Sequence, residues 1–146
     1  MPLTILNGPD SSINYSLFLL AFEKAPSLVI DCANYADPHK FFGSVPEEKL
    51  EHVFIMNAEA IYRFRDSLKK AAYWAERLRI KNVFVTTIGT LFSYDDKEED
   101  KDVTKNCWDI IKELSKRYNV YVATDNDKRY TIIPERYADK IIEEAP

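Results

Sequence analysis

Short apolar runs alternate with longer helix-like stretches along this chain. Five runs predict strands, because each joins several apolar, mostly β-branched or aromatic residues between polar segments. They cover residues 3–6, 27–30, 52–56, 82–88 and 119–124. The run "NVFVTTI" at 82–88 is continuous rather than alternating, which is typical of a strand buried on both faces of a parallel sheet.

Three stretches between these runs have helical length. Residues 14–25 are largely apolar and end before Pro26, and residues 102–118 carry apolar side chains on one side. Residues 58–79 repeat apolar side chains at helical spacing, at Ile61, Phe64, Leu68, Ala71, Ala75 and Leu78. The alternation of strand and helix predicts an α/β fold: a three-layer sandwich with a mostly parallel central sheet, in a single domain spanning residues 1–146.

Other segments are interpreted from local composition. The acidic run "DDKEEDKD" (95–102) predicts a solvated loop, and residues 125–128 a polar turn. Residues 129–133 fit an edge strand. Pro134 suits the first position of a closing helix through residue 145.

Composition and charge narrow the class of protein. The chain has 146 residues, of which 46% are hydrophobic and 13% aromatic, values typical of a globular protein. The net charge is −4, and residues 95–102 alone account for it with six acids and two lysines. This balance excludes nucleic-acid binding driven by overall charge but leaves room for a local basic face. Glutamine is absent and charged residues are plentiful, a bias found in thermophilic proteins.

The sequence predicts a cytoplasmic protein whose cysteines are reduced and bind no metal. No apolar run reaches the roughly 18 residues of a membrane span, and no secretory signal pattern opens the chain. Cys32 and Cys107 lie far apart and without metal-ligand spacing, so we expect buried, reduced thiols. The two histidines, His39 and His52, also lack zinc-site spacing.

Polar residues follow each expected strand, where parallel sheets collect their ligands. Four such segments, in chain order, resemble the RecA/RadA/KaiC family of ATPases. "LNGPDSSINYSLFLLAF" (6–22) is similar to the Walker A strand, loop and helix of that family, and "LVIDCANYADPHKF" (28–41) to its second strand. "KNVFVTTIGTLF" (81–92) is similar to the Walker B strand, and "YNVYVATDN" (118–126) to the sensor strand. The resemblance implies a truncated RecA-like core.

The same resemblance implies that the ATPase chemistry is lost. The degenerate loop consists of Gly8, Pro9, Asp10, Ser11, Ser12, Ile13, Asn14 and Tyr15. Ile13, Asn14 and Tyr15 replace the second glycine, the lysine and the Ser or Thr of the motif. Ala33 stands where the family has the glutamate that activates water, and Thr86 where it has the Walker B aspartate. Without charge neutralisation and water activation we expect neither ATP hydrolysis nor a bound cofactor.

A non-enzymatic role is therefore expected from the resemblance. It implies an accessory or scaffold protein that acts through protein contacts in DNA recombination or repair, with a recombinase or another ATPase as partner, or as a homodimer. Candidate contact residues are Arg63, Lys70, Tyr73, Trp74, Arg77 and Trp108, although core packing explains an aromatic residue equally well. The cationic stripe among them can face phosphates, an acidic protein or only solvent.

A second hypothesis is enzymatic. Asp31, Asp125 and Asp127 follow two expected strands, and "IDCANY" and "ATDNDKRY" resemble, more faintly, the metal-binding segments of PIN-like and NYN nucleases. Three carboxylates at one sheet edge can hold Mg²⁺ against a phosphodiester, which predicts a metal-dependent ribonuclease. The alternative is that all three aspartates only stabilise turns.

Overall fold

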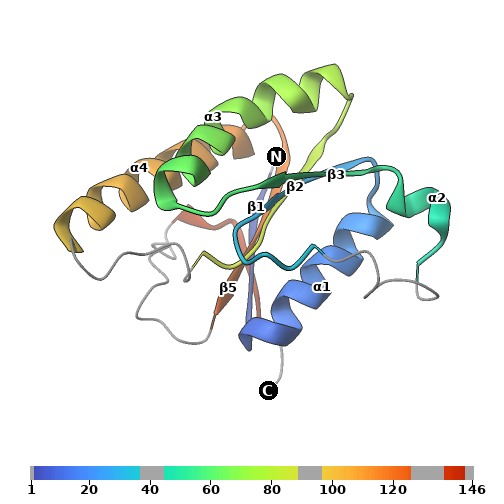
Figure 1. The fold of residues 1–146 in the computed structure, drawn as a ribbon, viewed down its shortest axis with the longest axis horizontal. Coiled ribbons are helices and arrows are strands. Elements are labelled where there is room, and N and C mark those ends of the chain that lie inside the picture. The colour runs from blue at the N-terminus through green and yellow to red at the C-terminus, as the bar shows by residue number, and fades with distance from the viewer. Residues whose placement is uncertain (1, 37–44, 89–96, 126–136, 144–146) are drawn as a thin grey trace.

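The computed structural model describes residues 2–36, 45–88, 97–125 and 137–143, and it contains one six-stranded sheet (Figure 1). The strands are β1 (Leu3–Gly8), β2 (Ser27–Asp31), β3 (Val53–Asn57), β4 (Asn82–Val85), β5 (Asn119–Asp125) and β6 (Lys140–Glu143). Their order is β3-β2-β4-β5-β1-β6, and every neighbouring pair is parallel. The predicted parallel α/β fold is confirmed.

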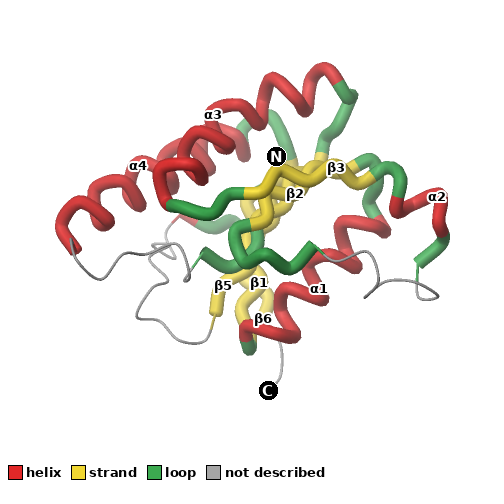
Figure 2. Tube along the Cα trace, in the orientation of Figure 1, coloured by secondary structure: helices red, strands yellow, loops and turns green. Residues whose placement is uncertain are grey.

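Helices cover both faces of the sheet (Figure 2). On one face lie α1 (Asp10–Glu23) and the short α2 (Glu47–Leu50), and on the other lie α3 (Ile61–Arg77) and α4 (Lys97–Ser115). This division follows from right-handed crossovers, because the chain moves one way along the sheet after β1 and β2 and the other way after β3 and β4. The three predicted layers are therefore present.

The core consists of two apolar clusters, one on each side of the sheet. Successive residues of β2 alternate between them: Val29 packs with α1, and Ile30 packs with α3 and α4. Phe84 and Val85 of β4 divide in the same way. Because both faces are buried, these strands are apolar at nearly every position, which is why their sequences are continuous runs.

The expected loop at residues 95–102 is corrected in part. α4 begins at Lys97, so residues 97–102 belong to the first turns of this helix, while residues 95 and 96 lie outside the described residues. Acidic residues are favourable at a helix N-terminus because the helix dipole places partial positive charge there. An acidic run that predicts a solvated loop is therefore also compatible with the start of a helix.

The expected closing helix is wrong over residues 140–143, which form β6, while the expected strand at 129–133 lies outside the described residues. β6 pairs in parallel with β1, with Thr4 opposite Lys140 and Asn7 opposite Glu143. Figure 2 shows β6 beside β1 at the end of the sheet. The pairing supplies partners for the backbone of β1, and this gain outweighs the helical preference of the sequence.

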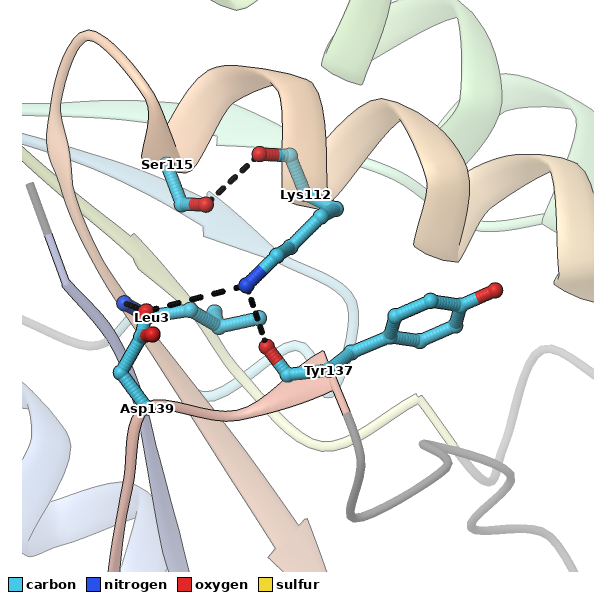
Figure 3. Close-up of polar contacts among 5 residues, drawn as sticks. All are labelled: Leu3, Lys112, Ser115, Tyr137 and Asp139. Carbon is cyan, nitrogen blue, oxygen red and sulfur yellow. Dashed lines mark hydrogen bonds and ion pairs between the residues drawn. The ribbon is translucent and has the colours of Figure 1, made fainter.

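A small polar cluster attaches β6 to the rest of the fold (Figure 3). The Asp139 carboxylate accepts a hydrogen bond of 2.7 Å from the Leu3 backbone N–H, and the Asp139 N–H donates to the Leu3 carbonyl at 2.8 Å. From α4, the Lys112 ammonium donates to the Tyr137 carbonyl at 2.8 Å and lies 3.8 Å from the Asp139 carboxylate. Lys112 thus links α4 to the segment that leads into β6.

Among the described residues, no helix combines the length and the apolar character needed to cross a lipid bilayer.

We expect Lys112→Ala to lower the free energy of unfolding by about 1 kcal/mol, because a charge-assisted hydrogen bond and a partly exposed ion pair are lost. Urea unfolding followed by circular dichroism measures the change. Lys116→Ala is the matched control: Lys116 pairs with Glu113 on the exposed surface, so its loss should change stability by less than about 0.5 kcal/mol. Equal effects of the two substitutions would show that Lys112 does not hold the C-terminal segment.

Candidate functional site

The carboxyl ends of β2 and β4 meet at a change of direction in the sheet. β2 and β4 are neighbours, yet the chain after β2 packs on the α1 face through Tyr35 and Ala36, whereas α4, which follows β4, lies on the opposite face. In open parallel sheets such a point is where ligands bind, because the diverging connections leave a crevice. It is the candidate site of this protein.

Polar residues at this point bond to one another. The Asn14 amide, at 1% exposure, donates to the Thr87 hydroxyl at 2.9 Å, and its carbonyl oxygen accepts from the Thr87 backbone N–H at 3.0 Å. The hydroxyl of Thr86 accepts from the Cys32 backbone N–H at 2.7 Å. α1, β2 and the end of β4 are therefore joined by a buried hydrogen-bond network.

Asp31 organises the turn that follows β2. The carboxylate is buried and accepts backbone hydrogen bonds from Ala33 at 3.2 Å, Tyr35 at 3.1 Å and Ala36 at 2.8 Å. Within this turn Asn34 adopts a left-handed backbone conformation, with φ of 52°, which asparagine tolerates better than most residues. This arrangement agrees with the interpretation of Asp31 as a turn-stabilising residue.

A cavity of about 530 Å³ lies beside the turn, at the ends of β2 and β3. Its wall combines backbone and small side chains with a few polar groups: Asp31, Cys32, Ala33, Asn34, Ala36, Asn57, Ala58 and Glu59. Its two acidic residues are Asp31 and Glu59, and none of the described residues that line it is a lysine or an arginine. The described part of this cavity therefore lacks the positive charge that would attract a phosphate.

The expected phosphate loop is largely helical. β1 ends at Gly8 and α1 begins at Asp10, so only Pro9 separates them. Ile13 is buried at 2% exposure in the apolar core on the α1 face, and Tyr15 packs against the same core. The segment thus offers no extended glycine loop whose amides could surround a phosphate.

The three candidate nuclease aspartates are not assembled by the described structure. Asp31 and Asp125 end strands that are separated by β4, which places their backbones more than about 10 Å apart. Asp127 lies outside the described residues. Over the described ranges, no group of three His, Cys, Asp or Glu side chains is placed to hold a metal ion.

Both cysteines are buried and reduced. Burial raises the pKa of Cys32 well above its ordinary value, and the neighbouring Asp31 charge raises it further. Burial likewise raises the pKa of Cys107 to about 12, against an opposing effect of Arg65 and Lys69. A thiol that stays protonated at neutral pH is a poor nucleophile, so these cysteines serve as core residues.

The expected contact residues divide into two groups. Tyr73 and Trp74 are 54% and 41% exposed on α3, on the same helix as the exposed Arg63, Lys70 and Arg77. Trp108 is only 3% exposed and belongs to the core between α4 and the sheet. Its assignment as a contact residue is corrected, because a buried indole offers no surface to a partner.

Sequence reasoning missed two features of the sites. It interpreted Asn14 only as the replacement of a lysine and did not predict its two hydrogen bonds to Thr87. The available signal was that both are polar residues beside apolar runs. It also passed over Tyr62, which is 40% exposed on α3. Its position one residue from the buried Ile61 and two from the buried Phe64 indicated an outward direction.

Comparison with known proteins gives no family assignment: no family model matches the chain, and no curated protein matches its sequence.

We expect Asn14→Ala to lower the free energy of unfolding by about 2 kcal/mol, because the buried N–H and hydroxyl of Thr87 lose their partner. Chemical denaturation measures the change. Asn57→Ala is the control at the same edge of the sheet, since Asn57 is exposed and its loss should stay within about 0.5 kcal/mol. A neutral Asn14→Ala variant would mean that water replaces the amide without cost.

We expect stability to fall as the pH rises from 9.0 toward about 12. Below this window the thiols hold their protons in both states, whereas within it the unfolded chain releases protons that the folded chain retains. Cys107→Ala should flatten the pH dependence by up to about 1.4 kcal/mol per pH unit. Denaturation of both proteins across the window gives the two slopes, and identical slopes would contradict the raised pKa.

Proposed function

We propose that this protein is a catalytically inactive, RecA-like accessory or scaffold protein that acts through protein-protein contacts. The observation that carries the proposal is the hydrogen-bond network at the strand ends. The resemblance matches Asn14 to the phosphate-binding lysine and Thr86 to the Walker B aspartate, and both side chains are bonded within the protein, Asn14 to Thr87 and Thr86 to Cys32. Side chains already satisfied by one another have little to offer a ligand.

The order of the strands supports the RecA-like part of the proposal. The four segments that resemble the family fall on β1, β2, β4 and β5. These four strands are neighbours in the sheet, in the order β2-β4-β5-β1, so their carboxyl ends lie side by side. Segments that are far apart in sequence are thereby adjacent, as a common site would require.

Phosphoryl transfer nevertheless lacks its main chemical terms here. α1 carries Asn14 rather than a cation at the position that the resemblance matches to the lysine. Thr86 is fully buried, and its hydroxyl accepts a hydrogen bond from the Cys32 backbone N–H. Charge neutralisation and preorganised donors supply most of the rate enhancement of such enzymes. The frame therefore fits a structural or regulatory role better than turnover.

We expect ATP with Mg²⁺ at 5 mM to shift the melting temperature by less than about 1 °C. A ligand at 100 times its dissociation constant stabilises by about 2.7 kcal/mol, which corresponds to a shift of several degrees in a domain of this size. Differential scanning fluorimetry measures the shift, with tripolyphosphate as the control for nonspecific anion effects. A magnesium-dependent shift of several degrees with ATP alone would refute the inactive site.

A parallel assay distinguishes the nuclease hypothesis from the scaffold proposal. Labelled RNA is incubated with the protein and Mg²⁺ or Mn²⁺, beside Asp31→Asn and Asp125→Asn variants. Cleavage by the wild type that both variants lose would replace the scaffold proposal. Cleavage that persists unchanged in both variants would indicate a contaminating nuclease.

A further inference from the structure

Positive charge is concentrated on one element of this acidic protein. Residues 61–81, which include α3, contain seven Arg or Lys residues and two acids, an excess of five positive charges in a chain whose net charge is −4. Six of the cations are exposed: Arg63, Lys69, Lys70, Arg77, Arg79 and Lys81. In addition, Glu76 is paired with Arg117. α3 and α4 form the layer on one face of the sheet (Figure 1), and the exposed positions of α3 carry an excess of cations.

Flat aromatic side chains lie among these cations. Tyr62, Tyr73 and Trp74 are 40%, 54% and 41% exposed. Tyr73 and Trp74 meet edge to face, with ring centroids 5.2 Å apart. The Arg77 guanidinium lies over the Tyr73 ring at 5.3 Å and donates to its hydroxyl at 2.7 Å. These contacts hold the rings in place, which lowers the entropic cost of using them for binding.

Helix electrostatics do not account for the whole surface. Arg77, Arg79 and Lys81 lie at the C-terminal end of α3, where cations are favoured by the helix dipole. Arg63 lies in the first turn, where a cation is unfavourable, and Lys69 and Lys70 lie in the middle of the helix. No ion pair within the described part of the chain engages Arg63, Lys69 or Lys70.

The cationic surface continues past the end of α3. A cavity of about 300 Å³ there is lined in part by Arg79, Lys81 and Arg117. The C-terminal ends of α3 and α4 each contribute only about half a negative charge. Three cations and the single carboxylate of Glu76 therefore leave the cavity positive.

From this combination we infer that the outer face of α3 binds single-stranded nucleic acid, with phosphates on its Arg and Lys side chains and bases stacked on Tyr73 and Trp74. Interleaved aromatic and cationic side chains are the usual means of binding unpaired strands. A protein partner is the weaker choice, because the core of a protein interface is depleted of charged residues, whereas exposed cations run along α3 from Arg63 to Arg77. α3 is about 25 Å long, enough for several nucleotides. The inference does not depend on the proposed inactive nucleotide site.

Fluorescence anisotropy with 5′-labelled 15-nucleotide oligo(dT) and oligo(U) tests this inference at 50 mM salt. We expect Trp74→Ala to weaken binding by about 5- to 150-fold, since one stacked base is lost, and Trp74→Phe to retain most of it. The logarithm of the affinity should fall with the logarithm of the salt concentration with a slope of about −3, as four phosphate contacts predict. Lys70→Glu should make this slope shallower.

Lys49→Glu is the matched control, because Lys49 is exposed on α2, on the opposite face of the sheet, and the charge change is the same. Thermal melts of each variant verify that the fold is retained. Failure of both oligonucleotides to bind would overturn the inference, as would equal loss in Lys70→Glu and Lys49→Glu. Binding of poly-L-glutamate as tightly as oligo(dT), with no effect of Trp74→Ala, would assign the face to an acidic protein instead.

Discussion

Burial of both faces of the central strands is the constraint on which this structure depends. β2 and β4 pack against α1 on one side and against α3 and α4 on the other, so Val29, Ile30, Phe84 and Val85 are all essentially inaccessible to water. Polar groups at the ends of such strands are buried with them. A buried polar group without a partner costs free energy, so each of these groups must find a hydrogen bond inside the protein or on a ligand.

This protein uses internal partners at its strand ends. Asn14 and Thr87 satisfy each other twice, Thr86 receives the Cys32 N–H, and Asp31 receives three backbone donors. The same arrangement stabilises the fold and reduces the chemistry available at the site. In an active nucleotide enzyme, these positions would remain incompletely satisfied until the ligand arrives, and the binding energy would come from that difference.

The sequence predicts the parts of the fold that depend on local pattern. Continuous apolar runs identified five strands, and helical spacing identified α3 with its buried positions Ile61, Phe64 and Leu68. Features that depend on contacts between residues far apart in the chain could not be predicted from local pattern. β6 is a strand because it pairs with β1, some 136 residues earlier, and Trp108 is buried because α4 packs on the sheet. The start of α1 at Asp10 was also missed, since polar residues resembled a loop.

Charge distribution separates the two sites of the molecule. The cavity at the ends of β2 and β3 has Asp31 and Glu59 in its wall, whereas residues 61–81, which include α3, carry an excess of cations. Overall charge conceals this difference, because the chain outside residues 61–81 carries a net charge of −9, which outweighs the cationic excess in the sum. Screening limits the interaction of exposed charges to about 8–10 Å at physiological salt, so a phosphate at α3 responds to the nearby Arg and Lys side chains rather than to the net charge. A protein that is acidic overall can thus bind a polyanion, provided that its negative charge lies elsewhere on the surface.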